Sequence, residues 1–377
     1  MRWILLVSCF AFGPTAQAAD FSKVDFEKAV AAIKKSSHIQ LTDAQIYQAA
    51  LNGVLFELEK KNDAPSLRPS DQANVVLAPR SVSELKKDLE GKVSGVGLVI
   101  EYAPDKGQRY PFVKDVIKKS GAADAGILKA DEILKIEGKS VQDFASFQDI
   151  VFSLRGKEES TVIITVLRKG DVLTKKMTRK KIEWEPIESS FLQPNIAHIK
   201  IRYFNEKTKG LLKSALLAAQ EKKSETLILD LRGCGGGSLE EGLGALNMFY
   251  KKDAIMLNIM SREKKEVKTA SEEGLAFGRK MIVLVDKESR SMCEAFAASL
   301  KGSGYASVIG EPTFGKASVE TLYEMDSGYS AKFTVAQMLD GQGQSWQGAG
   351  VQPDIKVMAS EGDTDAALQA AIRFAKR

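Results

Sequence analysis

The order of apolar and polar residues predicts a mixture of buried strands and amphipathic helices. Short runs rich in β-branched residues, over 226–231 and 281–285, have the length and composition of buried strands. Apolar residues at helical spacing predict helices over 208–220 and 364–376. Strands and helices alternate through the C-terminal half, which indicates a fold that combines both.

The region from residue 19 to residue 90 is charged and has a helical pattern. Thr42 and Gln45 are spaced as in a capping box, and apolar residues at helical spacing follow over 46–58. A second, shorter helix is predicted over 82–89.

Residues 1–18 are typical of a secretory signal peptide. Arg2 precedes an apolar run over 3–12, and Ala16-Gln17-Ala18 forms a small-residue cleavage site. We therefore expect cleavage after about Ala18 and export, in a bacterium to the periplasm. A lipoprotein cysteine at Cys9 is the alternative, but the apolar region before it would be unusually short.

Composition narrows the class of protein. The 377 residues allow two or three domains, and 44% hydrophobic with 27% charged residues is ordinary for a soluble globular protein. The net charge of +5 is small and spread along the chain, so it indicates neither a nucleic-acid partner nor a membrane surface.

Two residues are candidates for chemistry. Ser291 lies between a polar turn at 286–290 and a helical pattern, where a serine exposes its hydroxyl beside unpaired helix N–H groups. An ordinary helix N-cap is the alternative. Lys316 lies in a glycine-flanked loop after the predicted strand 306–309, where close backbone approach lets the amine point inward. A solvated surface lysine is the alternative.

The histidine content favours lysine as a base. His38 lies in a polar stretch, and His198 lies in the alternating segment 196–201, where it reads as a strand side chain. A Ser–His–Asp triad therefore has few candidates for its base, and a hydrolase on this chain would use a desolvated, neutral lysine. Ser291 and Lys316 are the predicted catalytic pair.

The segments around this pair resemble a known family. Residues 289–294 read SRSMCE and residues 310–320 read GEPTFGKASVE. They resemble the patterns S-A-S-A-S-E and G-E-x-T-F-G-K-G-x-V-Q of the C-terminal processing peptidases, or tail-specific proteases. These are Ser/Lys endopeptidases with an embedded PDZ domain. Lys316 follows Ser291 by 25 positions, as in the family. Cys293, Ala317 and Glu320 depart from the pattern.

Glu320 stands where the family has glutamine. The resemblance implies that Glu320 orients Lys316, while its carboxylate would also favour the charged form of the lysine.

The resemblance implies a fold and a domain order. The expected class is α/β (α+β): a crotonase-like ββα protease core with an inserted, circularly permuted PDZ domain and an N-terminal helical segment. The residues 347–355, QGAGVQPDI, resemble the closing motif Q-G-x-G-I-x-P-D-I. The expected parts are a signal peptide (1–18), a helical region (19–90), a PDZ domain (91–182), the core (183–358) and a C-terminal helix (359–377).

A glycine-rich loop follows the predicted strand 226–231. Residues 230–237, DLRGCGGG, resemble the family's D-L-R-N-N-P-G-G, and no G-K-[ST] follows that would indicate a phosphate loop. We predict that Gly236, Gly237 and the Met292 N–H stabilise an oxyanion, and a purely structural turn is the alternative. Cys234 and Cys293 both lie in these loops, as a disulfide or as two buried reduced thiols.

Residues 94–100, SGVGLVI, are a glycine turn that enters a strand. With the segments that follow to residue 167, they resemble the inserted PDZ domain, in which Ala130 replaces the usual glycine. Backbone N–H groups in such a turn capture a peptide's C-terminal carboxylate, while the peptide adds to the sheet as a strand. The predicted substrate-binding residues are Gly95, Val96, Gly97, Leu98 and Val99.

Together with the signal-peptide pattern, the resemblance implies an exported serine endopeptidase that cleaves proteins recognised by their C-terminal tails through an acyl-enzyme. Ser291 is the expected nucleophile and Lys316 the general base. Self-association through the N- and C-terminal helices and an activating adaptor are further expectations. The two cysteines and two histidines give no metal-ligand spacing, and no cofactor is implied. The alternatives are a non-catalytic scaffold that binds peptide C-termini, or an enzyme of this fold acting on another acyl substrate.

Overall fold

The computed structural model describes residues 22–36, 40–61, 74–90, 94–102, 107–144, 147–182, 185–358 and 365–376. The predicted signal peptide lies outside the described residues. The chain divides into two units, residues 1–51 and 52–377. In the part that the structure describes, no helix has both the length and the apolar character needed to cross a bilayer.

The first unit contains α1 (Lys23–Ser36) and the start of α2 (Asp43–Lys61), which continues into the second unit. The predicted capping box begins α2, because the Thr42 N–H donates to Gln45 Oε1 at 2.8 Å and the Gln45 N–H donates to Thr42 Oγ1 at 3.2 Å. In the second unit, α3 (Pro79–Leu89) is the predicted short helix. Just before α3 lies a strand that the helical pattern does not predict, β1 (Val75–Leu77).

A six-stranded sheet organises the second unit, in the order β10-β11-β12-β15-β16-β19. β10 is antiparallel to β11, and the other neighbours are parallel. The strands are β10 (Ile187–Gln193), β11 (Ile196–Ile201), β12 (Thr226–Asp230), β15 (Lys280–Val285), β16 (Ala306–Gly310) and β19 (Ile355–Lys356). Every residue of β12 is buried, as expected for a central parallel strand covered on both faces.

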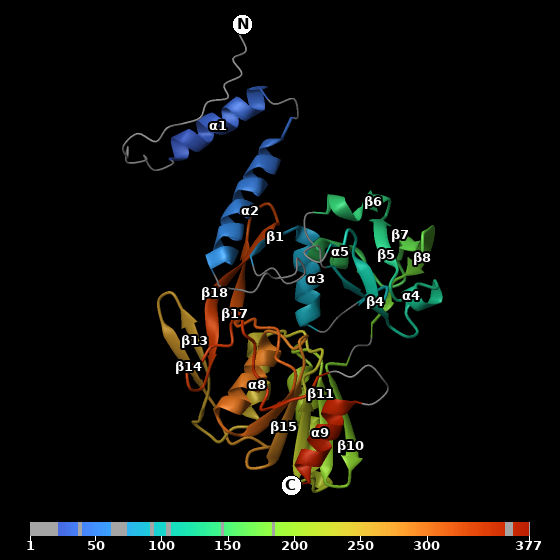
Figure 1. Ribbon diagram of the computed structural model, residues 1–377. Coiled ribbons are helices and arrows are strands. Elements are labelled where there is room, and N and C mark those ends of the chain that lie inside the picture. The colour runs from blue at the N-terminus through green and yellow to red at the C-terminus, as the bar shows by residue number, and fades with distance from the viewer. Residues whose placement is uncertain are drawn as a thin grey trace, which may run out of the picture. The chain divides into compact units, whose positions relative to one another are not determined.

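Helices cover both faces of this sheet (Figure 1). Along β12, Leu227 and Leu229 belong to one apolar cluster and Ile228 belongs to another, because successive strand side chains point to opposite faces. The first cluster includes residues of α6 (Thr208–Glu221), α7 (Leu239–Asn247) and α8 (Met292–Gly302). The second includes α9 (Ala366–Ala375), which packs against β15 and β16.

A second sheet lies against the other side of α8, whose residues 292–300 are all buried. Its order is β1-β18-β13-β14, and β17 also pairs with β18. Its strands, besides β1, are β13 (Ile255–Ser261), β14 (Lys265–Thr269), β17 (Ser318–Glu324) and β18 (Ser330–Asp340). The apolar character of α8 is thereby explained, since it packs between two sheets.

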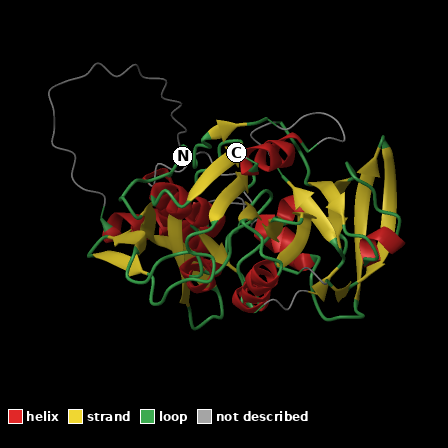
Figure 2. Ribbon diagram, turned by 90° about the horizontal axis from the view of Figure 1, so that it is seen from below, coloured by secondary structure: helices red, strands yellow, loops and turns green. Residues whose placement is uncertain are grey.

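Residues 94–181 form the predicted PDZ domain with its own core, which includes Ile133 and Ile164. Figure 2 shows its strands and short helices. The main sheet has the order β3-β4-β5-β7-β8, with β6 on β5, and β2 pairs with β9. The elements are β2 (Ser94–Gly95), β3 (Leu98–Glu101), β4 (Phe112–Val116), α4 (Gly121–Asp124), β5 (Glu132–Ile136), β6 (Lys139–Ser140), α5 (Phe147–Ser153), β7 (Thr161–Arg168), β8 (Asp171–Thr178) and β9 (Lys180–Lys181).

The fold therefore agrees with the predicted class: a mixed α and β core with an embedded PDZ domain. Ala130 has a φ of 72°, which explains why glycine is usual there.

Candidate active site

The candidate residues lie on loops that leave three neighbouring parallel strands, β12, β15 and β16. Because the carboxyl ends of parallel strands meet at one edge of a sheet, these loops come together there. Hydrogen bonds join them directly: the Gly233 N–H donates to Asp286 Oδ1 at 3.0 Å, and the Phe314 N–H donates to the Ser289 carbonyl at 3.0 Å. The topology thus unites segments that are up to 80 residues apart in the sequence.

Ser291 is the N-cap residue of α8, at the turn after β15. Its backbone has φ 57° and ψ −123°, a conformation that serine rarely adopts and that surrounding contacts must maintain. Gly236 lies against it, since a Cβ at position 236 would be 2.9 Å from Ser291 Cβ and 3.2 Å from the Arg290 carbonyl oxygen. Only a glycine allows the loop after β12 to approach the serine this closely.

Glu294 fixes the positions of Ser291 and Lys316 relative to each other. The sequence did not single out this residue. Its buried carboxylate accepts from the Ser291 N–H at 2.9 Å and the Lys316 N–H at 2.8 Å on Oε2. On Oε1 it accepts from Thr313 Oγ1 at 2.5 Å and the Gly315 N–H at 2.6 Å. Burial raises the pKa of Glu294 to about 7, although these hydrogen bonds oppose the rise. Its position three residues after Ser291, as in a capping box, was the available signal.

Lys316 is mostly buried, and its Nζ lies 2.6 Å from Glu320 Oε1. Among the described residues it forms no hydrogen bond with Ser291 Oγ, a contact that often tightens only when substrate binds. Burial has the largest influence on the pKa of Glu320 and acts to raise it. The charges of Lys316 and Lys332 outweigh burial, so that the pKa lies below its usual range.

The three predicted oxyanion donors differ in availability. The Gly236 N–H already donates to Cys293 Sγ at 3.0 Å. Neither Gly237 nor Met292 donates its N–H to an acceptor in the described part of the chain. Gly237 has a φ of 132°, and a Cβ there would lie 2.1 Å from the Phe204 carbonyl oxygen. The free donors are therefore Gly237 and Met292, while Gly236 shapes the loop.

Cys234 and Cys293 form a disulfide, with a Cα–Cα separation of 6.0 Å. Both residues are fully buried. The sequence left open a disulfide or two buried reduced thiols, and the structure contains the disulfide. It joins the glycine loop after β12 to the first turn of α8, two residues after Ser291.

The motif at residues 347–355 forms hydrogen bonds with the loop that contains Lys316. Gln347 Oε1 accepts from the Ala317 N–H at 2.7 Å, and the Gly348 N–H donates to the Gly315 carbonyl at 2.8 Å. The backbone around Lys316 is thus bonded on both sides.

The predicted peptide-binding residues of the PDZ domain divide into two groups. Gly95 pairs with Lys180, and Val96 is buried in the PDZ core, so both serve the domain's own structure. Leu98 and Val99 belong to β3, which lies at one end of the sheet order and pairs only with β4 among the described strands. The outer edge of β3 is therefore open to an added strand.

Gly97 adjoins this strand. It has a φ of 80°, and a Cβ at position 97 would lie 2.2 Å from Ser120 Cβ.

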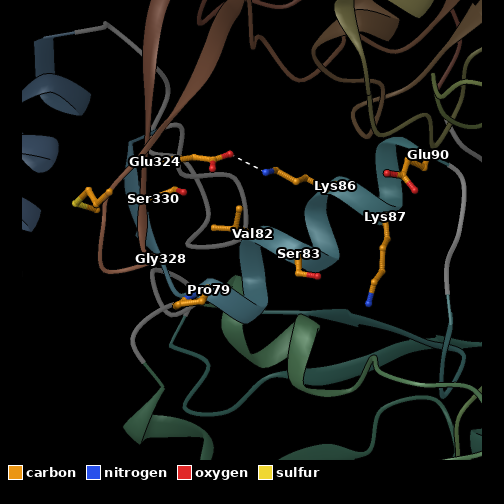
Figure 3. A pocket seen from close by; sticks show the side chains of 10 residues that line it. Pro79, Val82, Ser83, Lys86, Lys87, Glu90, Glu324, Gly328 and Ser330 are labelled. Atoms are coloured by element: carbon orange, nitrogen blue, oxygen red, sulfur yellow. Dashed lines mark hydrogen bonds and ion pairs between the residues drawn. The ribbon is translucent and has the colours of Figure 1, made fainter.

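A cavity of about 530 Å³ lies between α3 and the turn from β17 to β18 (Figure 3). Lys86 and Glu324 form an ion pair at 2.6 Å across it. The lining contains neither Ser291 nor Lys316, and its mixed charges do not define a class of ligand, so we do not place the active site there.

Comparison with known proteins identifies similar families, sequences and structures. Residues 195–357 match the model of peptidase family S41, and residues 91–178 match a PDZ domain model. The chain is 29% identical over 347 residues to the carboxy-terminal processing protease CtpA of Bacillus subtilis, covering 91% of this chain and 71% of that protein. It is 29% identical over 319 residues to a CtpA-like serine protease of Staphylococcus haemolyticus, described as probable, covering 84% and 61%. This chain thus spans less than two thirds of the latter's length.

Among solved structures, the photosystem II D1 C-terminal processing protease is similar, with a TM-score of 0.63 and 22% identity. The match covers 92% of this chain and 90% of that one, and it supports the fold. Residues 195–357 are thus similar to peptidase family S41 and residues 91–178 to PDZ domains, an order that the similar carboxy-terminal processing protease sequence supports.

Proposed function

We propose that this protein is an exported serine endopeptidase that cleaves proteins recognised by their C-terminal tails. Ser291 is the nucleophile and Lys316 is the general base. The observation that carries the proposal is the shared acceptor: one oxygen of the buried Glu294 carboxylate binds the backbone N–H groups of both residues. This contact ties the two reacting side chains to one rigid point, as general-base catalysis requires.

The reaction proceeds through an acyl-enzyme. Neutral Lys316 takes the proton from Ser291 Oγ as the oxygen attacks the carbonyl carbon of the scissile peptide bond. The Gly237 and Met292 N–H groups stabilise the oxyanion that forms. The C–N bond then breaks, and Lys316 delivers its proton to the leaving amine. In the second half, Lys316 takes a proton from the water that attacks the serine ester. The bond between the acyl carbon and Ser291 Oγ then breaks, the acid leaves, and Lys316 returns the proton to Ser291 Oγ.

Glu320 orients the base. Its contact with Lys316 Nζ holds the amine beside the catalytic loops. In the proposed reaction the amine turns from Glu320 to Ser291 Oγ. Lys316 is thus paired with Glu320 at rest and acts as the base during the reaction.

The PDZ domain selects the substrate. A C-terminal tail adds as a strand to the open edge of β3 and places its carboxylate near the turn at Gly97. Lys114 on β4 lies 3.6 Å from Glu288, in the turn before Ser291, so an ion pair connects the PDZ domain with the nucleophile's turn.

Export fits the buried disulfide, because disulfides persist in oxidising compartments such as the periplasm. We accordingly retain cleavage of a signal peptide after about Ala18, self-association through the terminal helices and an activating adaptor as proposals.

The test is digestion of an unstructured protein that ends in an apolar tail. The variants are Ser291→Ala and Lys316→Met, and Lys287→Met is a matched control because Lys287 is exposed in the turn before Ser291. We expect cleavage by the wild type and by Lys287→Met alone. The same substrate with an amidated C-terminus should be cut more slowly, since it lacks the carboxylate.

Two outcomes would contradict the proposal. Equal cleavage by Ser291→Ala would exclude the serine as nucleophile. Tail binding by the wild type, without cleavage and without labelling of Ser291 by a fluorophosphonate, would identify a scaffold.

A further inference from the structure

Three charged side chains form a buried cluster where the hairpin of β17 and β18 begins. Glu320 Oε1 lies 2.6 Å from Lys316 Nζ, and Glu320 Oε2 lies 3.8 Å from Lys332 Nζ. The side chains of Lys316, Glu320 and Lys332 are 12%, 20% and 9% exposed. Glu320 and Lys332 are diagonal neighbours, because Glu320 pairs with Thr334 and Leu322 pairs with Lys332.

The two neighbours of Lys316 act in opposite directions. Glu320 attracts the proton of Lys316 and favours the charged form, whereas the like charge of Lys332 favours the neutral form. When Lys316 is neutral, Glu320 and Lys332 remain as an oppositely charged pair. Without Lys332, loss of the proton would leave a buried carboxylate with no cation from this cluster, which is a costly state.

We propose that Lys332 is a positioning residue for the catalytic base: its charge offsets that of Glu320 beside Lys316 and thereby favours the neutral form of that lysine. The activity part of this inference rests on the proposed function, while the proton equilibrium does not. The lowered pKa of Glu320 is consistent with cations on both sides of the carboxylate, since their charges outweigh the opposing influence of burial.

Other groups face the cluster from the elements around it. Ser318 Oγ on β17 lies 3.4 Å from Glu320 Oε1. Glu294, in the first turn of α8, accepts from the Lys316 backbone N–H at 2.8 Å. Lys332→Arg keeps the charge and Lys332→Met removes it, so the comparison of the two variants separates the charge of Lys332 from its other contacts.

The first experiment measures the proton equilibrium directly. The folded, full chain is labelled with a trace of acetic anhydride from pH 6 to pH 11, and mass spectrometry quantifies acetylation of Lys316. The exposed Lys287 is the internal reference. The variants are Lys332→Met, which keeps the aliphatic stem, Lys332→Arg, which keeps the charge, Glu320→Gln, and the double variant Glu320→Gln/Lys332→Met. Thermal melting establishes that each variant is folded.

We expect the midpoint of Lys316 labelling to rise by about one pH unit in Lys332→Met, since a like charge has been removed. Lys332→Arg should keep the wild-type midpoint, and Glu320→Gln should lower it. The double variant should return close to the wild type, because both opposing charges are gone. A wild-type midpoint in folded Lys332→Met, or a double variant that matches either single variant, would overturn the proposal.

The second experiment records the rate of fluorophosphonate labelling of Ser291 against pH. The acid limb of this profile should move to higher pH by about one unit in Lys332→Met. At a pH below the midpoint, the rate of Ser291 labelling should therefore be roughly tenfold lower than in the wild type. A uniform loss at every pH would indicate a structural role and contradict the proposal. If the wild type does not label at all, the proposed function fails, and acetylation of Lys316 still decides the role of Lys332.

Discussion

The backbone N–H groups of Ser291 and Lys316 donate to the same carboxylate oxygen of Glu294, at 2.9 and 2.8 Å. The two residues are far apart in sequence and leave different strands, yet a single buried atom fixes their relative position. The other oxygen of Glu294 accepts from Thr313 and Gly315, so that the carboxylate accepts four hydrogen bonds.

Glu294→Gln should therefore impair activity although it preserves shape. An amide offers one accepting oxygen, so two of the four donors would face an NH₂ group that cannot accept. We expect a loss of roughly 1–3 kcal/mol in the free energy of unfolding and at least a tenfold slower labelling of Ser291. Glu324→Gln is the matched control, because that carboxylate is exposed on β17. Equal labelling rates in the two variants would refute the assigned role.

The same carboxylate predicts a dependence of stability on pH. Glu294 releases its proton near pH 7 in the folded state, and near the ordinary value of 4.5 when unfolded. Between these values the folded state binds more protons, so the contribution of Glu294 to stability is full below pH 4.5. It is lost as the pH rises to about 7, by on the order of 3 kcal/mol. Urea denaturation across pH 4–8 should show this decline in the wild type and lack it in Glu294→Gln. Parallel curves would contradict the prediction.

The sequence predicts the fold well where the pattern is strong. The strand predicted over 281–285 is β15 (Lys280–Val285), and the helix predicted over 208–220 is α6 (Thr208–Glu221). β1 escapes prediction, since three apolar residues within a charged, helical region carry little periodicity. It forms because β18 provides a partner across more than 250 residues, which no local pattern encodes.

The candidate site shows the same limit. Motif spacing predicts Ser291, Lys316 and Glu320, and the structure brings Glu320 within 2.6 Å of the lysine amine. The spacing does not reveal Glu294, because a glutamate at the third helical position reads as a cap. Nor does it show that the Gly236 N–H is already bonded to Cys293 Sγ, which depends on a contact between distant loops.

Ala130 offers a test of backbone strain in the PDZ domain. With a φ of 72°, the alanine lies in the left-handed region that glycine adopts freely. Ala130→Gly should stabilise the domain by about 1 kcal/mol and raise its melting temperature. Ala123→Gly is the control, since residue 123 lies in α4 and glycine should destabilise it there. Destabilisation by both substitutions would disprove the strain.

The disulfide predicts a requirement for oxidation. Without the bond between Cys234 and Cys293, the glycine loop and α8 lose a covalent link that contributes typically 2–4 kcal/mol. Cys293→Ala should melt at lower temperature and label Ser291 more slowly. The double variant Cys234→Asn/Cys293→Ser carries the residues of the family pattern at both positions, and we expect it to recover labelling even in dithiothreitol. A Cys293→Ala variant as stable and reactive as the wild type would show that the bond is dispensable.

Substitutions at two adjacent glycines test how closely the glycine loop approaches Ser291. At Gly236, which has a φ of 97°, a Cβ would lie 2.9 Å from Ser291 Cβ, so Gly236→Ala must displace the loop or the serine. At Gly235 a Cβ meets no atom within 4 Å, and the backbone does not require glycine. We expect Gly236→Ala to reduce fluorophosphonate labelling by at least a hundredfold and Gly235→Ala to leave it within about twofold. Since both variants add one methyl group to the same loop, similar rates would show that the loop is not placed against the serine, and the oxyanion donors would then lie elsewhere.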